Sequence, residues 1–165
     1  MSLDLVELAK SLVEVARLAH VDLRLRDIQT ELLPAPHRRP NSLPPGTQAV
    51  YAFILGESCL KVGKAGPKTQ ARFTSQHYGQ NARSTLAKSI LNDRSRTLAL
   101  VRADHRSEVE SLDIGSIGSW LERNTSRAHV FIPATAPDCA LALAESFTQC
   151  RLRPIYEGKR SSNGG

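Results

Sequence analysis

The sequence predicts a small α/β domain of the α+β kind, in which a central, mostly antiparallel sheet is flanked by helices. Two runs rich in β-branched and aromatic residues, 47–55 and 59–65, are separated by only three residues, which is typical of a hairpin. A third such run, 127–134, lies between two helical patterns. The 165 residues, of which 41% are hydrophobic, suffice for one core of ordinary size.

The first 46 residues are expected to precede this core as a helical extension, 1–33, and a linker, 34–46. Residues 3–19 have apolar side chains at helical spacing: Leu5, Leu8, Leu12, Val15 and Ala19. Residues 21–33 are ambiguous, because strand-like alternation at the start gives way to helical spacing. Five prolines and a glycine then interrupt regular structure in the linker.

The main domain is assigned to residues 47–158, followed by a short tail, 159–165, that is rich in serine and glycine. Beyond the three strands, helical patterns are recognised at 67–78, 84–93, 116–124 and 136–154. The run 97–103 is compatible with either a strand or a helix end. The last helix begins next to Pro137 and ends before Pro154, both in positions that proline favours.

The composition indicates which kind of partner the chain binds and in which cellular compartment it works. A net charge of +6 and a pI of about 9.6 favour a polyanion such as nucleic acid. Residues 68–106 contain eight Lys or Arg against two Asp. Three cysteines without C-x-x-C spacing indicate a reducing, cytoplasmic setting rather than a disulfide framework or a zinc site. No apolar run is long enough to cross a membrane, and the oligomeric state is left open.

The Gly63-Lys64 pair at the end of the second strand does not form a nucleotide-binding loop. A Walker A loop needs a glycine five residues before this one and a Ser or Thr after the lysine. Ser58 and Ala65 occupy those two positions. A structural hairpin glycine is the simplest reading of Gly63 when it is taken by itself.

The order of motifs around this glycine resembles that of the GIY-YIG nucleases. The two half-motifs correspond to "AVY" at 49–51 and "KVG" at 61–63. An arginine on the following helix corresponds to Arg72, and a glutamate on a late helix corresponds to Glu145, ahead of "RPIY". The resemblance covers about residues 47–158. It implies a metal-dependent endonuclease that hydrolyses phosphodiester bonds in DNA, with Tyr51, Arg72 and Glu145 among its catalytic residues.

Four positions depart from the family pattern. Ala49 replaces the first glycine, and Lys61 replaces the second tyrosine while keeping a hydrogen-bond donor. Gln76 stands where a histidine is often found one turn after the arginine, with His77 beside it, and Glu157 takes the place of an asparagine. The catalytic set predicted for this chain is therefore Tyr51, Lys61, Arg72 and Glu145.

The chemistry of these side chains suits phosphodiester hydrolysis. Glu145 supplies an oxygen ligand for Mg²⁺ or Mn²⁺, which take one or two protein carboxylates and keep several waters. Arg72 can donate a bidentate pair of hydrogen bonds to a phosphate. Tyr51 can relay the proton of the nucleophile if nearby positive charge lowers its pKa, with Lys61 on the neighbouring strand. A structural ion pair between Arg72 and Glu145 is the competing explanation for a carboxylate on this helix.

The expected nucleic-acid partner is double-stranded DNA, bound through its phosphates. Five residues are predicted to contact it: Lys64, Lys68, His77, Arg83 and Lys88. Two alternatives remain. The chain is either a catalytically inactive nucleic-acid-binding module with the same fold, or a protein-interaction subunit that acts through its N-terminal helix.

Overall fold

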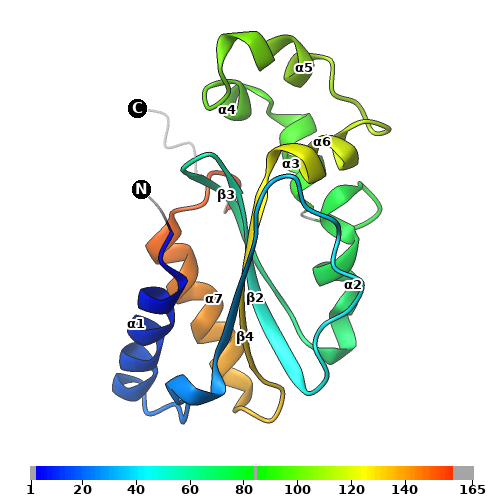
Figure 1. The fold of residues 1–165 in the computed structure, drawn as a ribbon. Coiled ribbons are helices and arrows are strands. Elements are labelled where there is room, and N and C mark those ends of the chain that lie inside the picture. Colours follow the sequence, from blue (N-terminus) through cyan, green and yellow to red (C-terminus); the bar gives the residue numbers. More distant parts are fainter. Residues whose placement is uncertain (1–2, 84, 158–165) are drawn as a thin grey trace, which may run out of the picture.

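A computed structural model describes residues 3–83 and 85–157 and contains one four-stranded antiparallel sheet. The strands lie in the order β1-β4-β2-β3, with β1 at Gln29–Leu33, β2 at Thr47–Leu55, β3 at Ser58–Ala65 and β4 at Ser126–Pro133. Helices cover both faces of this sheet (Figure 1). The α+β class and the antiparallel sheet predicted from the sequence are confirmed.

The two faces of the sheet carry separate cores. Helices α1 (Leu5–Leu18) and α7 (Asp138–Leu152) cover one face (Figure 1). The short helices α2 (Gln70–Thr74), α3 (Leu86–Asn92) and α6 (Ile117–Asn124) lie on the other. Helices α4 (Ser95–Leu98) and α5 (Arg106–Glu110) extend beyond the sheet.

The β2–β3 hairpin turns at two residues, Gly56 and Glu57, since Leu55 pairs with Ser58. Gly56 adopts a positive φ of 59°, which favours glycine and suits a two-residue hairpin turn. Strand β2 lies between β4 and β3 and is covered on both faces, so Val50, Tyr51 and Phe53 are all buried. This position explains the near-continuous apolar run in the strand.

The N-terminal extension is part of the same core. Leu8, Leu12 and Ala16 of α1 are buried in one cluster with Val50 and Val62 of the central hairpin. Residues 29–33, where the spacing indicated a helix, form the edge strand β1, because each residue pairs with β4. The segment 1–33 is therefore not wholly helical, and it contributes one strand of the sheet.

The proline-rich segment 34–46 packs against the domain at two points. His37 and Leu43 are buried, and the backbone N–H of His37 donates to the carbonyl oxygen of Glu122 at 2.8 Å. The segment is thus extended chain held to the surface of the domain. The predicted tail, 159–165, lies outside the described residues.

Two of the expected helices differ in detail. The pattern at 67–78 is divided into a 3-10 turn at Pro67–Thr69, the helix α2 and a second 3-10 turn at Gln76–Tyr78. The ambiguous run 97–103 holds the end of α4 and contains no strand.

Across the part of the chain that the structure describes, no helix is long and apolar enough to span a bilayer. All three cysteines are free thiols.

Candidate active site

A small cavity of about 80 Å³ lies at the β3 edge of the sheet. All four side chains of the predicted catalytic set border it: Tyr51 from β2, Lys61 from β3, Arg72 from α2 and Glu145 from α7. Its other lining residues are Val62, Gly63, Lys64, His77 and Glu157. Segments far apart in the sequence therefore meet at one place, where the α2 side and the α7 side of the sheet come together around its edge.

Tyr51 and Gly63 face each other directly across the β2–β3 pair. A Cβ atom at Gly63 would lie 2.7 Å from the Tyr51 hydroxyl oxygen and 2.8 Å from ring carbons. These distances are shorter than a van der Waals contact, so only glycine lets the tyrosine ring lie flat over β3 at this point. Gly63 is thus more than a hairpin residue, because it makes room for the side chain that borders the cavity.

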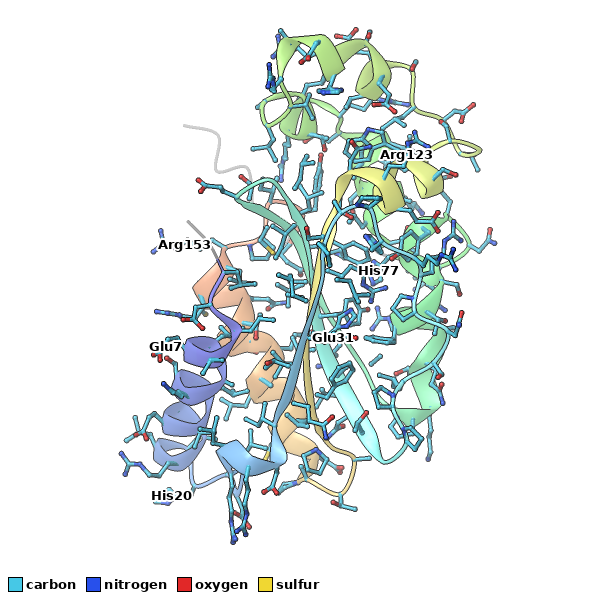
Figure 2. The ribbon with its side chains drawn as sticks, in the orientation of Figure 1. Glu7, His20, Glu31, His77, Arg123 and Arg153 are labelled. Carbon is cyan, nitrogen blue, oxygen red and sulfur yellow. The ribbon has the colours of Figure 1, made fainter. Side chains whose placement is uncertain are left out.

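His77 holds the Tyr51 hydroxyl from the α2 side. Its Nδ1 lies 3.2 Å from the backbone nitrogen of Leu86, which can only donate, so Nδ1 is the acceptor. In the neutral ring the proton is therefore on Nε2, which donates to the Tyr51 hydroxyl at 2.7 Å. The hydroxyl proton of Tyr51 is not used in this bond. His77 lies in the second 3-10 turn near the sheet (Figure 2).

The prediction that His77 contacts nucleic acid is not supported by this arrangement. Its side chain is buried, and both ring nitrogens are bonded within the protein. Burial, with the nearby positive charges of Lys61, Arg127 and Arg72, lowers its pKa to about 3. The ring is neutral at pH 7 and orients Tyr51 rather than attracting an anion.

The ionisation of Tyr51 is set by opposing causes. Burial is the largest, and it raises the pKa of the hydroxyl above its usual value. Arg127 and Arg72 oppose it by lowering the pKa, whereas Glu145 and Glu157 add to the rise. The positive charge that favours a phenolate therefore comes from two arginines, and Lys61 acts instead on His77.

Lys61 and Glu157, two of the positions that depart from the family pattern, form an ion pair. The Nζ of Lys61 lies 3.4 Å from a Glu157 carboxylate oxygen and donates to the backbone oxygen of Tyr156 at 3.3 Å. The Lys61 side chain is only 7% exposed. A buried ammonium needs such partners, so the lysine and the glutamate balance each other in charge.

Glu145 is paired with Lys64, not with Arg72. Its carboxylate lies 2.8 Å from the Lys64 Nζ, and the side chain is 21% exposed. The structural ion pair considered for this carboxylate therefore exists, but with a different partner. It places the Lys64 ammonium beside the cavity, in an ion pair with this carboxylate.

The donors around this cavity fit a hard divalent cation. Two carboxylates, Glu145 and Glu157, border the same space, and carboxylate oxygens are the ligands that Mg²⁺ and Mn²⁺ prefer. Within residues 3–83 and 85–157, no cluster of three or more His, Cys, Asp or Glu could hold a metal ion. Any such ion would thus depend on one or two protein carboxylates and on oxygens of a ligand.

The remaining predicted contact residues lie at the surface. Arg72, Lys68, Arg83 and Lys88 are all exposed. Lys68 lies in the first 3-10 turn beside Arg72, and Lys88 lies on α3. Their exposure makes them available to a large anionic partner approaching from the α2–α3 side.

Sequence reasoning missed two buried polar residues of β4 that support this site. The guanidinium of Arg127 lies 5.2 Å from the Tyr51 ring centroid and donates to the Phe73 backbone oxygen at 2.9 Å. His129 pairs with Tyr51 across the strands and donates from Nδ1 to Glu31 at 2.9 Å. Strand alternation in "RAHVF" is the signal that could have revealed them, since Arg127 and His129 share one face of a strand.

Acid is expected to destabilise the fold through its buried histidines. Burial lowers the pKa of both His77 and His129 to about 3, from about 6.5 in the unfolded chain. Between these values the unfolded state binds more protons, so stability falls as the pH falls. Each ring should remove about 1.4 kcal/mol per pH unit in that window, as measured by urea unfolding from pH 7 to pH 4.

The matched variants for that measurement are His77→Gln and His105→Gln. The first removes one buried ring, so the dependence of unfolding free energy on pH should become less steep. The second removes an exposed histidine and should leave the dependence as it is. Equal slopes for His77→Gln and the unaltered chain would contradict the burial of a neutral ring.

Comparison of this chain with protein-family models, with curated proteins and with solved structures finds no match in any of the three. The likeness to GIY-YIG nucleases therefore rests on the sequence motifs.

Proposed function

We propose that this protein is a metal-dependent endonuclease of the cytoplasm that hydrolyses phosphodiester bonds in double-stranded DNA. The observation that carries the proposal is the meeting of Tyr51, Lys61, Arg72 and Glu145 around one cavity. These residues come from two strands and two helices, and a purely structural role gives no reason for all four to converge. Hydrolysis of one phosphate does require a cation, a proton acceptor and a carboxylate within reach of the same oxygens.

Tyr51 acts as the group that exchanges a proton with the nucleophile. His77 donates to its hydroxyl oxygen, so the phenolate is stabilised by a hydrogen bond whenever it forms. Arg127 behind the ring and Arg72 at the cavity further favour that charge. Glu145 and Glu157 hold the pKa of Tyr51 up, so the reactive state is favoured only when their charge is offset.

Glu145, with Glu157 beside it, would hold the Mg²⁺ or Mn²⁺ ion, which supplies positive charge for the phosphate oxygens and offsets both carboxylates. In the structure this carboxylate is ion-paired with Lys64, whose ammonium would be free to bind a phosphate oxygen if the carboxylate held the metal ion. Arg72 is exposed and can donate two parallel hydrogen bonds to the scissile phosphate.

A supercoiled plasmid incubated with the protein and Mg²⁺ tests the proposal. Nicked or linear product, lost on addition of EDTA, is the expected result.

The alternative of an inactive nucleic-acid-binding module draws on the Lys64–Glu145 ion pair, which already satisfies the carboxylate. Binding of duplex DNA without cleavage under any divalent cation would favour that alternative. An interaction role for α1 has less support, because its apolar face is buried against the sheet.

Replacing Lys61 should lower the rate of DNA cleavage, and it should lower the melting temperature because the ion pair with Glu157 is lost. Lys61→Met leaves a partly buried carboxylate without its cation, so we expect the rate to fall by about 10²-fold or more and the melting temperature to drop. The double variant Lys61→Tyr with Glu157→Asn restores both residues of the family pattern and should recover part of the activity. Normal cleavage by Lys61→Met would show that the lysine is only structural.

Neutralising Arg83 and Lys88 together should weaken DNA binding without changing sequence preference. Both are exposed near the α2–α3 side, where phosphate contacts give salt-dependent affinity. The slope of log K against log salt should fall by about one unit for each lost contact. Titrations at several salt concentrations measure this slope. An unchanged slope would place the DNA on a different surface.

A further inference from the structure

A second cavity, of about 320 Å³, adjoins the candidate active site. It is lined by Arg96, Arg153, Pro154, Ile155 and Glu157. Glu157 borders both cavities, so the two spaces meet at this residue. A ligand that extends past the first cavity on this side therefore meets two guanidinium groups.

Arg96 is held in a fixed orientation at this second cavity. Its Nε lies 2.9 Å from a carboxylate oxygen of Asp93, and Nη1 donates to the backbone oxygen of Ile155 at 2.7 Å. Its Nη2 makes no hydrogen bond to any residue in the described part of the chain. One edge of a preorganised guanidinium thus remains open to an acceptor, which suits recognition of a phosphate oxygen.

Arg153 adopts a conformation that its residue type disfavours. It ends α7 with φ 47° and ψ 60°, in the left-handed region where glycine or asparagine is usual. It is exposed and forms no ion pair with any residue of 3–83 or 85–157. Figure 2 places it at the end of α7. Local backbone preference therefore does not account for an arginine at this position, and its exposed guanidinium is available to a ligand.

The charges around the second cavity leave an excess that is positive. Glu157 is offset by Lys61 at 3.4 Å, and Asp93 is offset by Arg96. Arg153 remains as the uncompensated charge of the lining. The cavity therefore attracts an anion. Because this cavity adjoins the first one, an anion bound here would lie next to a ligand bound there.

We propose that Arg96 and Arg153 form a phosphate subsite that binds the nucleic-acid backbone next to the phosphate being cleaved. This inference rests on the proposed function and adds to it the place where a neighbouring phosphate of the same DNA strand is bound, in the second of two adjoining cavities. A phosphodiester with no neighbouring phosphate fills the first cavity alone and gains nothing from Arg153.

The binding experiment uses the full chain carrying Glu145→Gln, so that cleavage does not interfere, and a fluorescently labelled DNA duplex. Arg153→Gln is compared with Arg151→Gln, which removes the same charge two residues away at a position that does not line this cavity. We expect Arg153→Gln to weaken binding about tenfold and to lower the salt slope by about one unit, and Arg151→Gln to change little. Arg153→Gly should weaken binding equally while raising the melting temperature, because it relieves the left-handed backbone.

A second assay distinguishes failure of this subsite from failure of the proposed function. It compares the hydrolysis of bis(p-nitrophenyl) phosphate, with Mn²⁺, by the unaltered chain and by Arg153→Gln. Equal rates on this small diester, together with weaker duplex binding, support the subsite. Unchanged duplex binding in Arg153→Gln and Arg153→Gly, or an equal loss in Arg151→Gln, overturns it even if plasmid cleavage is normal. If duplex binding depends on Arg153 but the protein does not cleave DNA, the phosphate subsite is supported and the proposed nuclease activity is contradicted. Absence of any duplex binding overturns both.

Discussion

Glu145→Gln is expected to abolish DNA cleavage while the protein stays folded and continues to bind DNA. Glutamine has the shape of glutamate but lacks its charge, and the position is partly exposed, so the fold should tolerate it. The loss of the anionic oxygen removes the predicted ligand of the divalent cation. We expect cleavage of supercoiled plasmid to fall by at least about 10²–10³-fold. Circular dichroism and duplex binding would show that the rest of the molecule is intact.

Lys64→Gln is the matched control, because it breaks the same 2.8 Å ion pair and keeps the carboxylate. If Glu145 served only to pair with Lys64, the two variants would lose activity to the same extent. We expect Lys64→Gln to raise KM through a lost phosphate contact while kcat stays within about tenfold of the unaltered chain. Full activity in Glu145→Gln would remove the mechanism proposed for this site.

Tyr51→Phe is expected to lower cleavage by about 10²–10⁴-fold, the range over which proton transfer by a positioned side chain contributes. The ring keeps its packing between Gly63 and Phe73, so the sheet should form. The Nε2–H of His77, however, loses the hydroxyl oxygen that accepts its hydrogen bond in a buried place. An unsatisfied buried donor of this kind costs about 1–3 kcal/mol, which thermal unfolding would record.

Tyr78→Phe separates stability from catalysis in that experiment. Tyr78 is also a buried tyrosine, and its hydroxyl is bonded to His37 at 2.7 Å and to Arg127 at 3.1 Å. It does not line the candidate cavity. We expect Tyr78→Phe to cost similar stability but to retain cleavage when both variants are assayed well below their melting temperatures. Equal loss of activity in the two variants would assign Tyr51 a structural role only.

The strands of the central hairpin and the last helix were predictable because their signals are local. Runs rich in β-branched and aromatic residues on either side of a short turn predict 47–55 and 59–65 as paired strands, and the prolines at 137 and 154 bracket the last helix. Strand periodicity places Lys61 and Gly63 on one face of β3 and Val62 on the other, and Val62 packs on the α1–α7 side. Such patterns are local, so they can be recognised without knowing which distant segments of the chain pack against these elements.

The edge strand at 29–33 was not predictable in this way. Only five residues long and largely exposed, it has little amphipathic pattern of its own. It becomes a strand because every residue pairs with β4, a segment about one hundred positions later in the chain. Backbone pairing over such a separation leaves no trace in local composition, so spacing alone favoured a helix.

The amino-acid sequence by itself determined which side chains are available for the proposed phosphate chemistry, and their order along the chain. It identified Tyr51, Lys61, Arg72 and Glu145, and it placed the basic excess in 68–106. Tertiary structure alone decided the partners of those side chains. Lys64 rather than Arg72 pairs with Glu145, and Glu157 pairs with Lys61.

The same distinction holds for His77, whose residue type and basic neighbourhood indicated a surface contact. Only packing against the sheet buries its ring and places the Leu86 N–H on Nδ1 and the Tyr51 hydroxyl on Nε2. Charge and hydrogen-bonding capacity are properties of a residue type and can be taken from the sequence. Burial and partner choice depend on which distant segments share a core, and these set the pKa and the tautomer on which the proposed chemistry depends.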